Sequence, residues 1–211
     1  MAVYAPNSRI KVHFVPFEEL HMELLDKVHE SYNITIMRRM MYRIATKLAI
    51  KKNCMCIING ESVGQVASQT LGSMQTINAV TNFPIIRPLC TYDKKDIIKI
   101  SREIDCFELS IKPFEDCCTI FEPKNPTTSP NLEKIIQIEE SFDFETHIRE
   151  CISNIKVIKV DEDYQDIKDV ALYNYNMIGA EFQKTHSENG TSRTWRTEDE
   201  ILGNICAFVG F

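Results

Sequence analysis

Short apolar segments alternate with helical patterns along the first half of the chain, and this order constrains the fold most. The run "CMCIIN" (54–59), bounded by Asn53 and Gly60, is typical of a buried strand in a parallel sheet. A polar segment and a helical pattern follow it. "PIIRPL" (84–89) is then a second short extended segment, with a proline at or near each end. Strands that alternate with helices form parallel sheets, so the sequence predicts an α/β fold, a parallel sheet with flanking helices.

The remaining periodicity extends this pattern in both directions. "IKVHFV" (10–15) predicts a strand, and Asn33 is the predicted N-cap of a long helix that ends near residue 52. Further helices are predicted over 17–29, 93–104, 131–140 and 143–152, and a further strand over 155–160. After about residue 173 the periodicity decays, which predicts a loop or poorly ordered tail. The predicted division is therefore a domain over 1–172 and a tail over 173–211.

Composition narrows the class of protein. The net charge of −6 argues against a wholly basic nucleic-acid-binding protein, although a local basic patch remains compatible with it. No uncharged apolar run reaches the length of about 18 residues expected of a transmembrane helix, and the first residues lack a secretion-signal pattern. The sequence therefore predicts a cytoplasmic protein without membrane contact, whose cysteines are thiols.

Cysteine and histidine spacing does not predict a metal site. The eight cysteines include no CxxC pair, because Cys54 and Cys56 form CxC and Cys117 and Cys118 are adjacent. Structural zinc sites bring their ligands in pairs separated by two to four residues, with further ligands downstream. The five histidines supply no such pairs, so no metal ligand is predicted.

Two polar features are candidates for ligand contact. The loop "NGESVGQVASQT" (59–70) follows a predicted strand, the position where open α/β sheets bind ligands, although a purely structural turn fits equally well. The basic stripe, which recurs every four residues along the long helix, consists of Arg39, Arg43, Lys47 and Lys51. A solvated face is favoured for this stripe over phosphate contact. Arg38, flanked by methionines, is expected to need a partner.

The pair Cys117 and Cys118 allows several interpretations. Neighbouring side chains of a strand point to opposite faces, so the simplest interpretation is that one thiol is functional and the other packs in the core. Glu115 and Asp116 precede the pair and raise a thiol pKa, so an activating cation must come from elsewhere. From the residues alone, core packing is favoured over catalysis.

Four segments in order together resemble a known family. They are "SYNITIMRRMMYRIA", "NGESVGQVASQTLGSMQTINAVTNFPIIRPL", "DKKDIIKI" and "PFEDCCTIFEPKNPTTSP". The chain resembles the C-terminal ATP-pyrophosphatase domain of tRNA 4-thiouridine synthetases, also called tRNA sulfurtransferases. The resemblance implies a partial adenine-nucleotide-α-hydrolase (Rossmann-like) domain. It also implies that ATP, with Mg²⁺, adenylates a tRNA uridine, and that a cysteine persulfide then delivers sulfur as AMP leaves.

The resemblance also implies roles for individual residues. Arg38, Gly60 and Gln69 match the family's nucleotide contacts, Lys94 matches a lysine of the activation chemistry, and Cys117 matches the sulfur-carrying cysteine. The implied partners are tRNA and a cysteine desulfurase as sulfur donor. The resemblance further suggests that the basic stripe lies along tRNA phosphates.

The chain departs from the family pattern upstream. Neither a THUMP domain nor the pyrophosphate loop "SGGxDS" occurs in it. The first hypothesis is therefore a fragment or one half of a split tRNA sulfurtransferase, with a partner chain supplying the remainder. The alternative is a non-catalytic remnant module that binds a nucleotide, tRNA or protein.

Overall fold

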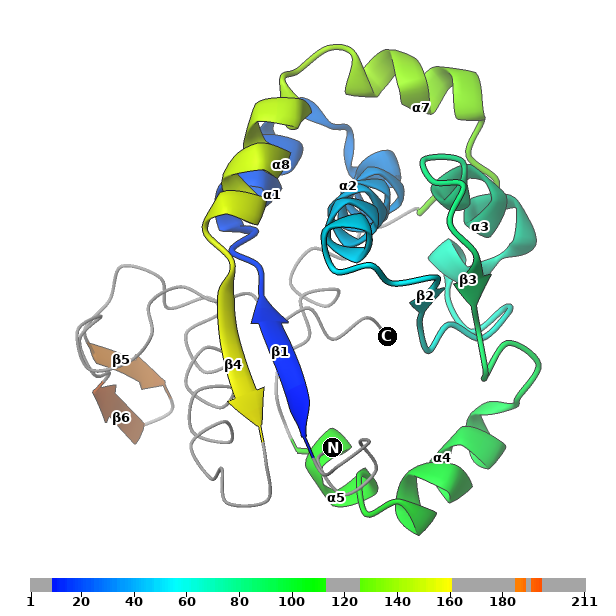
Figure 1. Cartoon of the computed structure of the whole chain (residues 1–211), viewed down its shortest axis with the longest axis vertical. Helices are drawn as coiled ribbons and strands as arrows, with labels where there is room; N and C mark the ends of the chain where they lie inside the picture. Colours follow the sequence, from blue (N-terminus) through cyan, green and yellow to red (C-terminus); the bar gives the residue numbers. More distant parts are fainter. Residues whose placement is uncertain (1–8, 113–125, 161–184, 189–190, 195–211) are drawn as a thin grey trace. The chain divides into compact units, whose positions relative to one another are not determined.

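The computed structural model describes residues 9–112, 126–160, 185–188 and 191–194 (Figure 1). The chain divides into two compact units. Unit 1 contains strands β1 (Ile10–Phe14), β4 (Lys156–Val160), β5 (Thr185–Glu188) and β6 (Thr191–Thr194). The other strands and the helices belong to unit 2, apart from the end residues Glu18 and Ser153, which fall in unit 1.

Unit 1 is built on an antiparallel pair of strands. Ile10 of β1 pairs with Val160 of β4, and Phe14 pairs with Lys156, so the two strands run side by side over their whole length (Figure 1). Both strands were predicted from their alternation. Their antiparallel pairing keeps β1 out of the parallel sheet that the strand–helix order suggested, because β1 and β4 form a separate two-stranded sheet.

A second antiparallel pair lies in the C-terminal region. β5 pairs with β6 from Thr185 opposite Thr194 to Glu188 opposite Thr191. The prediction of a loop or poorly ordered tail after residue 173 is therefore wrong for these two segments. Their sequences, "THSE" and "TSRT", contain no apolar residue, so the alternation that identifies a half-buried strand is missing.

Unit 2 carries the long helices and a small parallel sheet. Its elements in chain order are α1 (Glu18–Lys27), α2 (Glu30–Lys51), β2 (Ile57–Ile58), the 3-10 helix η3 (Ala67–Gln69), α3 (Leu71–Asn78), β3 (Ile85–Ile86), α4 (Lys94–Glu103), α5 (Phe107–Ser110), α7 (Leu132–Glu139) and α8 (Phe144–Ser153). Strands β2 and β3 pair in parallel, with Ile57 opposite Ile85. The predicted α/β class, with a parallel sheet and flanking helices, is confirmed.

The first strand of this sheet is shorter and more exposed than predicted. Only Ile57 and Ile58 of the apolar run form β2, and the side chains of Met55 and Ile58 are 86% and 64% exposed. The prediction of a buried strand is therefore wrong. An apolar run shows that a segment is able to lie in a core, but it does not show which other elements cover it.

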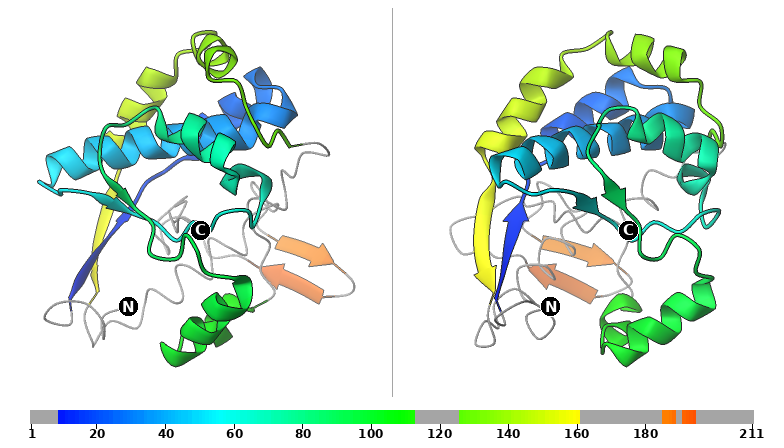
Figure 2. Two further views of the ribbon diagram at one scale, coloured as in Figure 1. Left: turned by 90° about the vertical axis from the view of Figure 1, so that its right-hand side faces the viewer. Right: turned by 45° about the vertical axis from the view of Figure 1, so that its right-hand side comes forward.

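Helix α2 forms the centre of the core of unit 2. Its fully buried residues Ile36 and Met40 lie one turn apart, and α2 packs along α3 (Figure 2). Apolar residues of the surrounding helices complete this core: Leu20, Leu24, Ile77, Ile135 and Ile148. Leu20 and Leu24 lie about one turn apart on α1, and this spacing is the pattern that predicted that helix.

The start of α2 differs from the prediction. Asn33 was the predicted N-cap, but the helix already begins at Glu30, and Asn33 is buried within its second turn. His29 occupies the cap position, and its Nδ1 accepts the backbone N–H of Ser31 at 3.3 Å. The imidazole thus satisfies a backbone donor of the first turn, a role that Asn or Ser more often fills.

Two further predictions concern the chain as a whole. The cysteines that the structure describes are free thiols, as predicted: Cys54, Cys56, Cys90, Cys106 and Cys151. Within the described ranges, no helix has both the length and the apolar character needed to cross a membrane.

Candidate functional site

A buried carboxylate forms the centre of a polar cluster in the loop that follows β2. The Glu61 side chain is 1% exposed, and Arg38 forms an ion pair with its Oε1. On the other oxygen, Arg87 Nε donates to Oε2 at 2.6 Å and Asn59 Nδ2 donates at 2.7 Å. Tyr42 donates its hydroxyl to Oε2 at 3.1 Å. These five residues are called the Glu61 cluster below.

The fold explains why these side chains meet. Arg38 and Tyr42 are four residues apart on α2, so they share one face of the helix. Asn59 and Arg87 each follow directly after a strand, and the carboxyl ends of parallel strands lie at the same edge of a sheet. Arg87 Nη2 also donates to Asn78 Oδ1 at 2.7 Å, which ties the cluster to the end of α3.

The cluster carries an excess of positive charge. Two guanidinium groups face one carboxylate, which leaves one net positive charge at the edge of the sheet. Burial raises the pKa of Glu61, but Arg38, Arg87 and Asn59 together outweigh it and hold that pKa below its usual value. Burial and the adjacent Glu61 carboxylate raise the pKa of Tyr42 to about 12, so its hydroxyl stays protonated and donates.

Two of the sequence-predicted site residues, Gly60 and Gln69, lie in this segment, and a third, Arg38, contacts it from α2. Arg38 Nη1 donates to Ser68 Oγ at 2.9 Å, and Gln69 follows Ser68 in η3. Gln69 is 8% exposed, yet its Oε1 accepts no hydrogen bond from the residues that the structure describes. Gly60 is exposed and immediately precedes Glu61. The structure thus brings Arg38, Gly60 and Gln69 together, with an unsatisfied buried acceptor among them.

Of the other two predicted site residues, the structure describes Lys94 but not Cys117. Lys94 is exposed in the first turn of α4, and the chain just before it is attached to the candidate loop, because Ser62 Oγ donates to the Tyr92 carbonyl at 2.9 Å. Cys117 lies outside the described residues, which break between 112 and 126. Its predicted role therefore stays a prediction.

The predicted solvated face of the basic stripe is wrong for its first half. Arg39 is 2% exposed, and both Arg39 and Arg43 bind the buried carboxylate of Glu139. Lys47, the third member, forms an exposed ion pair with Glu145 at 2.8 Å. Contact of the whole stripe with tRNA phosphates is excluded for the same reason. The four-residue spacing shows that the side chains share a face, but not that α7 covers part of it.

Sequence reasoning missed the residues that hold Arg38 in place. Glu61 and Arg87 were not singled out, although Arg87 is a charged residue inside the apolar, proline-fenced segment "PIIRPL". The same signal, a charge within an apolar segment, had correctly indicated that Arg38 needs a partner. Applied to Arg87, it would have indicated a second buried ion pair.

Acidification is expected to destabilise unit 2 through its buried carboxylates. Burial raises the pKa of Glu139, but hydrogen bonds from Arg39 and Arg43 outweigh this effect. The pKa of Glu139 therefore lies below 4.5, the ordinary value of a glutamate, as does that of Glu61. Their contribution to the free energy of unfolding is complete above pH 4.5 and is lost as pH falls further, through the lower folded-state pKa values.

Urea unfolding at several pH values between 7 and 3 measures this effect. The free energy of unfolding should fall more steeply below pH 4.5 in the unsubstituted chain than in Glu139→Gln, which lacks one of the two carboxylates. Equal slopes for the two proteins would contradict the prediction.

Comparisons with known proteins show which family has this sequence and fold. The family model "Thiamine biosynthesis protein (ThiI)" matches residues 1–144. The probable tRNA sulfurtransferase of Staphylococcus aureus strain Mu3 is 54% identical over 160 residues, and the match covers 76% of this chain and 39% of that relative. The corresponding protein of strain Newman is 53% identical over the same length.

A solved structure gives the same result. The crystal structure of a 4-thiouridine synthetase–RNA complex with bound ATP superposes with a TM-score of 0.69 at 36% identity, covering 72% of this chain and 40% of that one. The mixed α/β fold with its small parallel sheet thus corresponds to part of a 4-thiouridine synthetase. The chain belongs to the ThiI family. It spans about 39% of the length of the curated relatives.

Proposed function

We propose that this chain is the C-terminal, ATP-binding part of a tRNA sulfurtransferase that converts a uridine of tRNA to 4-thiouridine in the cytoplasm. The observation that carries the proposal is the Glu61 cluster. It places a net positive charge beside an exposed glycine, and its Arg38 contacts Ser68, the residue before Gln69 with its unsatisfied buried acceptor. The family match covers this whole region of the chain. The solved relative binds both ATP and RNA.

The residues of the site suit an adenine nucleotide. The Gln69 Oε1 atom lacks a donor among the described residues, and the amino group of an adenine is a donor of the required kind. Arg38, fixed at both ends of its guanidinium by Glu61 and Ser68, supplies positive charge for a phosphate. Gly60, having no side chain, permits close approach of the ligand to the backbone.

The Glu61 cluster does not suit Mg²⁺. Its carboxylate is engaged on both oxygens by Arg38 and Arg87, and cationic neighbours repel a divalent cation. No step is therefore assigned to the ion through this cluster.

In the proposed reaction, the uridine O4 oxygen attacks the α-phosphorus of ATP, and pyrophosphate leaves. A persulfide on Cys117, loaded by a cysteine desulfurase, then attacks C4 of the adenylated base through its outer sulfur, and AMP leaves with the former O4 oxygen. A second thiol attacks Cys117 Sγ and breaks the S–S bond, so the outer sulfur stays on C4 as 4-thiouridine. Cys117 is left in a disulfide, which a thiol reductant returns to the free thiol. A thiolate-type sulfur is a strong nucleophile toward such an activated carbon. Lys94 is proposed to stabilise negative charge that develops during adenylation.

Cys117→Ser is expected to abolish 4-thiouridine formation, whereas the neighbouring Cys118→Ser retains it. The chain should be co-expressed with the N-terminal portion of the Staphylococcus aureus relative in cells that lack their own 4-thiouridine synthesis. Digested tRNA is then analysed for 4-thiouridine by mass spectrometry. Persulfide labelling after incubation with a cysteine desulfurase and cysteine should mark the Cys118→Ser chain and not the Cys117→Ser chain.

The same experiment separates the alternatives. Persulfide on Cys117 without 4-thiouridine would indicate a sulfur-relay protein. Folded chain with neither product would favour a non-catalytic binding module and would sink the proposal.

A further inference from the structure

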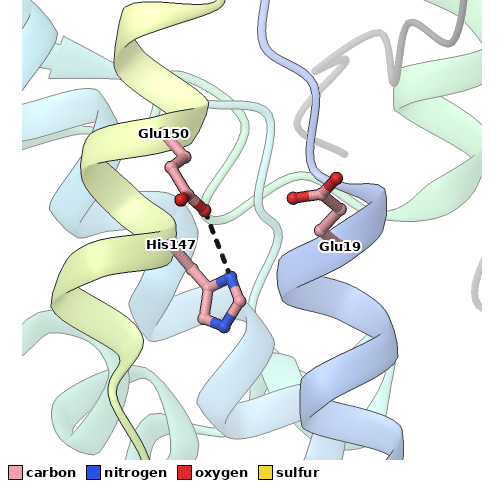
Figure 3. A group of neighbouring side chains, drawn as sticks. All are labelled: Glu19, His147 and Glu150. Carbon is pink, nitrogen blue, oxygen red and sulfur yellow. Dashed lines mark ion pairs between the residues drawn. The ribbon is translucent and has the colours of Figure 1, made fainter.

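A second polar cluster lies on unit 2, away from the loop that follows β2. Glu19 in the first turn of α1 faces His147 and Glu150 on α8 (Figure 3). One ligand atom of each residue lies within 4.8 Å of the other two. His147 and Glu150 are three residues apart and so share one face of their helix, and Glu19 approaches from a distant part of the sequence.

The His147 ring shows that the cluster is incomplete in the protein alone. Its Nδ1 atom is shielded from solvent and has no hydrogen-bond partner in the described part of the chain. The nearest charged group is Glu150 Oε2 at 3.6 Å, beyond hydrogen-bonding distance. A buried polar atom needs a partner, and a cation between this ring nitrogen and the two carboxylates would supply one.

We propose that Glu19, His147 and Glu150 bind one divalent transition-metal ion, of which Zn²⁺ is the best fit. Imidazole nitrogen and carboxylate oxygen are both ligands that Zn²⁺ accepts, and three protein ligands leave the fourth position to water. The ion neutralises the two carboxylates and joins α1 to α8. The histidine spacing in the sequence predicted no such site, because Glu19 reaches the other two ligands only through the packing of the helices.

The geometry requires a small adjustment. Bonds of about 2.0–2.2 Å place the ligand atoms of a tetrahedral zinc site roughly 3.4 Å apart. Atoms that now lie within 4.8 Å of one another must therefore approach by up to about 1.4 Å. Glu19 is exposed and the Glu150 side chain is 52% exposed, so both carboxylates have open space for this movement. Arg149, between the two α8 ligands in sequence, donates to Thr146 at 2.8 Å.

Titration of the full 211-residue chain with Co²⁺ tests the site, because the absorption spectrum of Co²⁺ reports its ligands. One equivalent is expected to bind without the charge-transfer band of a thiolate ligand. His147→Gln and Glu19→Gln should each lower the Co²⁺ affinity at least about tenfold. Glu133→Gln, which removes an exposed carboxylate of α7, is the matched control and should bind as the unsubstituted chain does.

Two further measurements separate binding at this site from binding to cysteine thiols and from effects of the substitutions on folding. The titration is repeated in a Cys54→Ser, Cys56→Ser variant, because the exposed Cys54 and nearby Cys56 also attract such ions. Zn²⁺ should raise the Tm of this variant but not of the same variant with Glu19→Gln, since an ion that binds only the folded state stabilises it. A spectrum with thiolate bands only, no bound ion, or equal affinity in His147→Gln would each overturn the proposal.

Discussion

Glu139→Gln is expected to lower the free energy of unfolding by about 3–5 kcal/mol, the cost of removing one partner from a buried ion pair. The Glu139 side chain is 3% exposed, and Arg39 and Arg43 each donate twice to it at distances of 2.7–2.8 Å. Without the carboxylate, the hydrogen bond from Arg39 Nη1 to the Thr76 carbonyl at 2.5 Å remains, but the guanidinium loses its charged partner. Its charge then lies uncompensated between α2 and α7.

Glu140→Gln is the matched control, because Glu140 is the next residue of the chain and is exposed. Its free energy of unfolding should change by less than about 0.5 kcal/mol, as is usual for surface substitutions. Urea unfolding of the three proteins, followed by circular dichroism, measures both effects. Equal stabilities of Glu139→Gln and Glu140→Gln would show that the two arginines find other partners or water.

Glu61→Gln is expected to cost about 3 kcal/mol or more of the free energy of unfolding. It keeps the shape of the side chain but removes the charge that Arg38 and Arg87 share, so two partly buried guanidinium groups are left facing each other. Glu103→Gln, on the exposed surface of α4, removes a carboxylate of the same kind and should leave stability nearly unchanged.

A double substitution distinguishes lost charge pairing from a general packing defect. In Glu61→Gln with Arg87→Gln, one of the two uncompensated charges is gone, so the double variant should be more stable than the sum of the single effects predicts. The expected coupling is about 0.5–3 kcal/mol by urea unfolding, the range for residues in one ion-pair network. Additive effects would contradict the shared-carboxylate interpretation.

The positions of most elements could be predicted from local pattern. The spacing of Leu20 and Leu24 places α1, and the alternation in "IKVIKV" places β4, because each pattern follows directly from the period of its element. The strand pairing could not be predicted in the same way. β1 pairs with β4, which lies more than 140 residues later in the sequence. Local sequence does not determine whether such a distant pair is parallel or antiparallel.

The candidate site was predicted in part. The resemblance implies Arg38, Gly60 and Gln69 as nucleotide contacts, and this role stays a prediction. In the structure, Arg38 of α2 contacts Ser68, the residue before Gln69. Glu61 was missed because it looks like an ordinary surface charge until its partners are known, and Arg87 was missed although its place in an apolar segment indicates a buried ion pair. The prediction of a solvated face for the basic stripe was wrong because a distant helix covers part of that face. A regular spacing of positive residues on α2 appeared solvated, yet α7 brings Glu139 against its first two members.

The sequence by itself determined the α/β class, the approximate positions of the helices and the family resemblance, since periodicity and motifs are properties of neighbouring residues. Only the tertiary structure decided which charges pair. Arg38 meets Glu61 and Arg39 meets Glu139, although these two arginines are adjacent in the sequence. They diverge because neighbouring side chains point about 100° apart around a helix, so one is directed toward the β2 loop and the other toward α7.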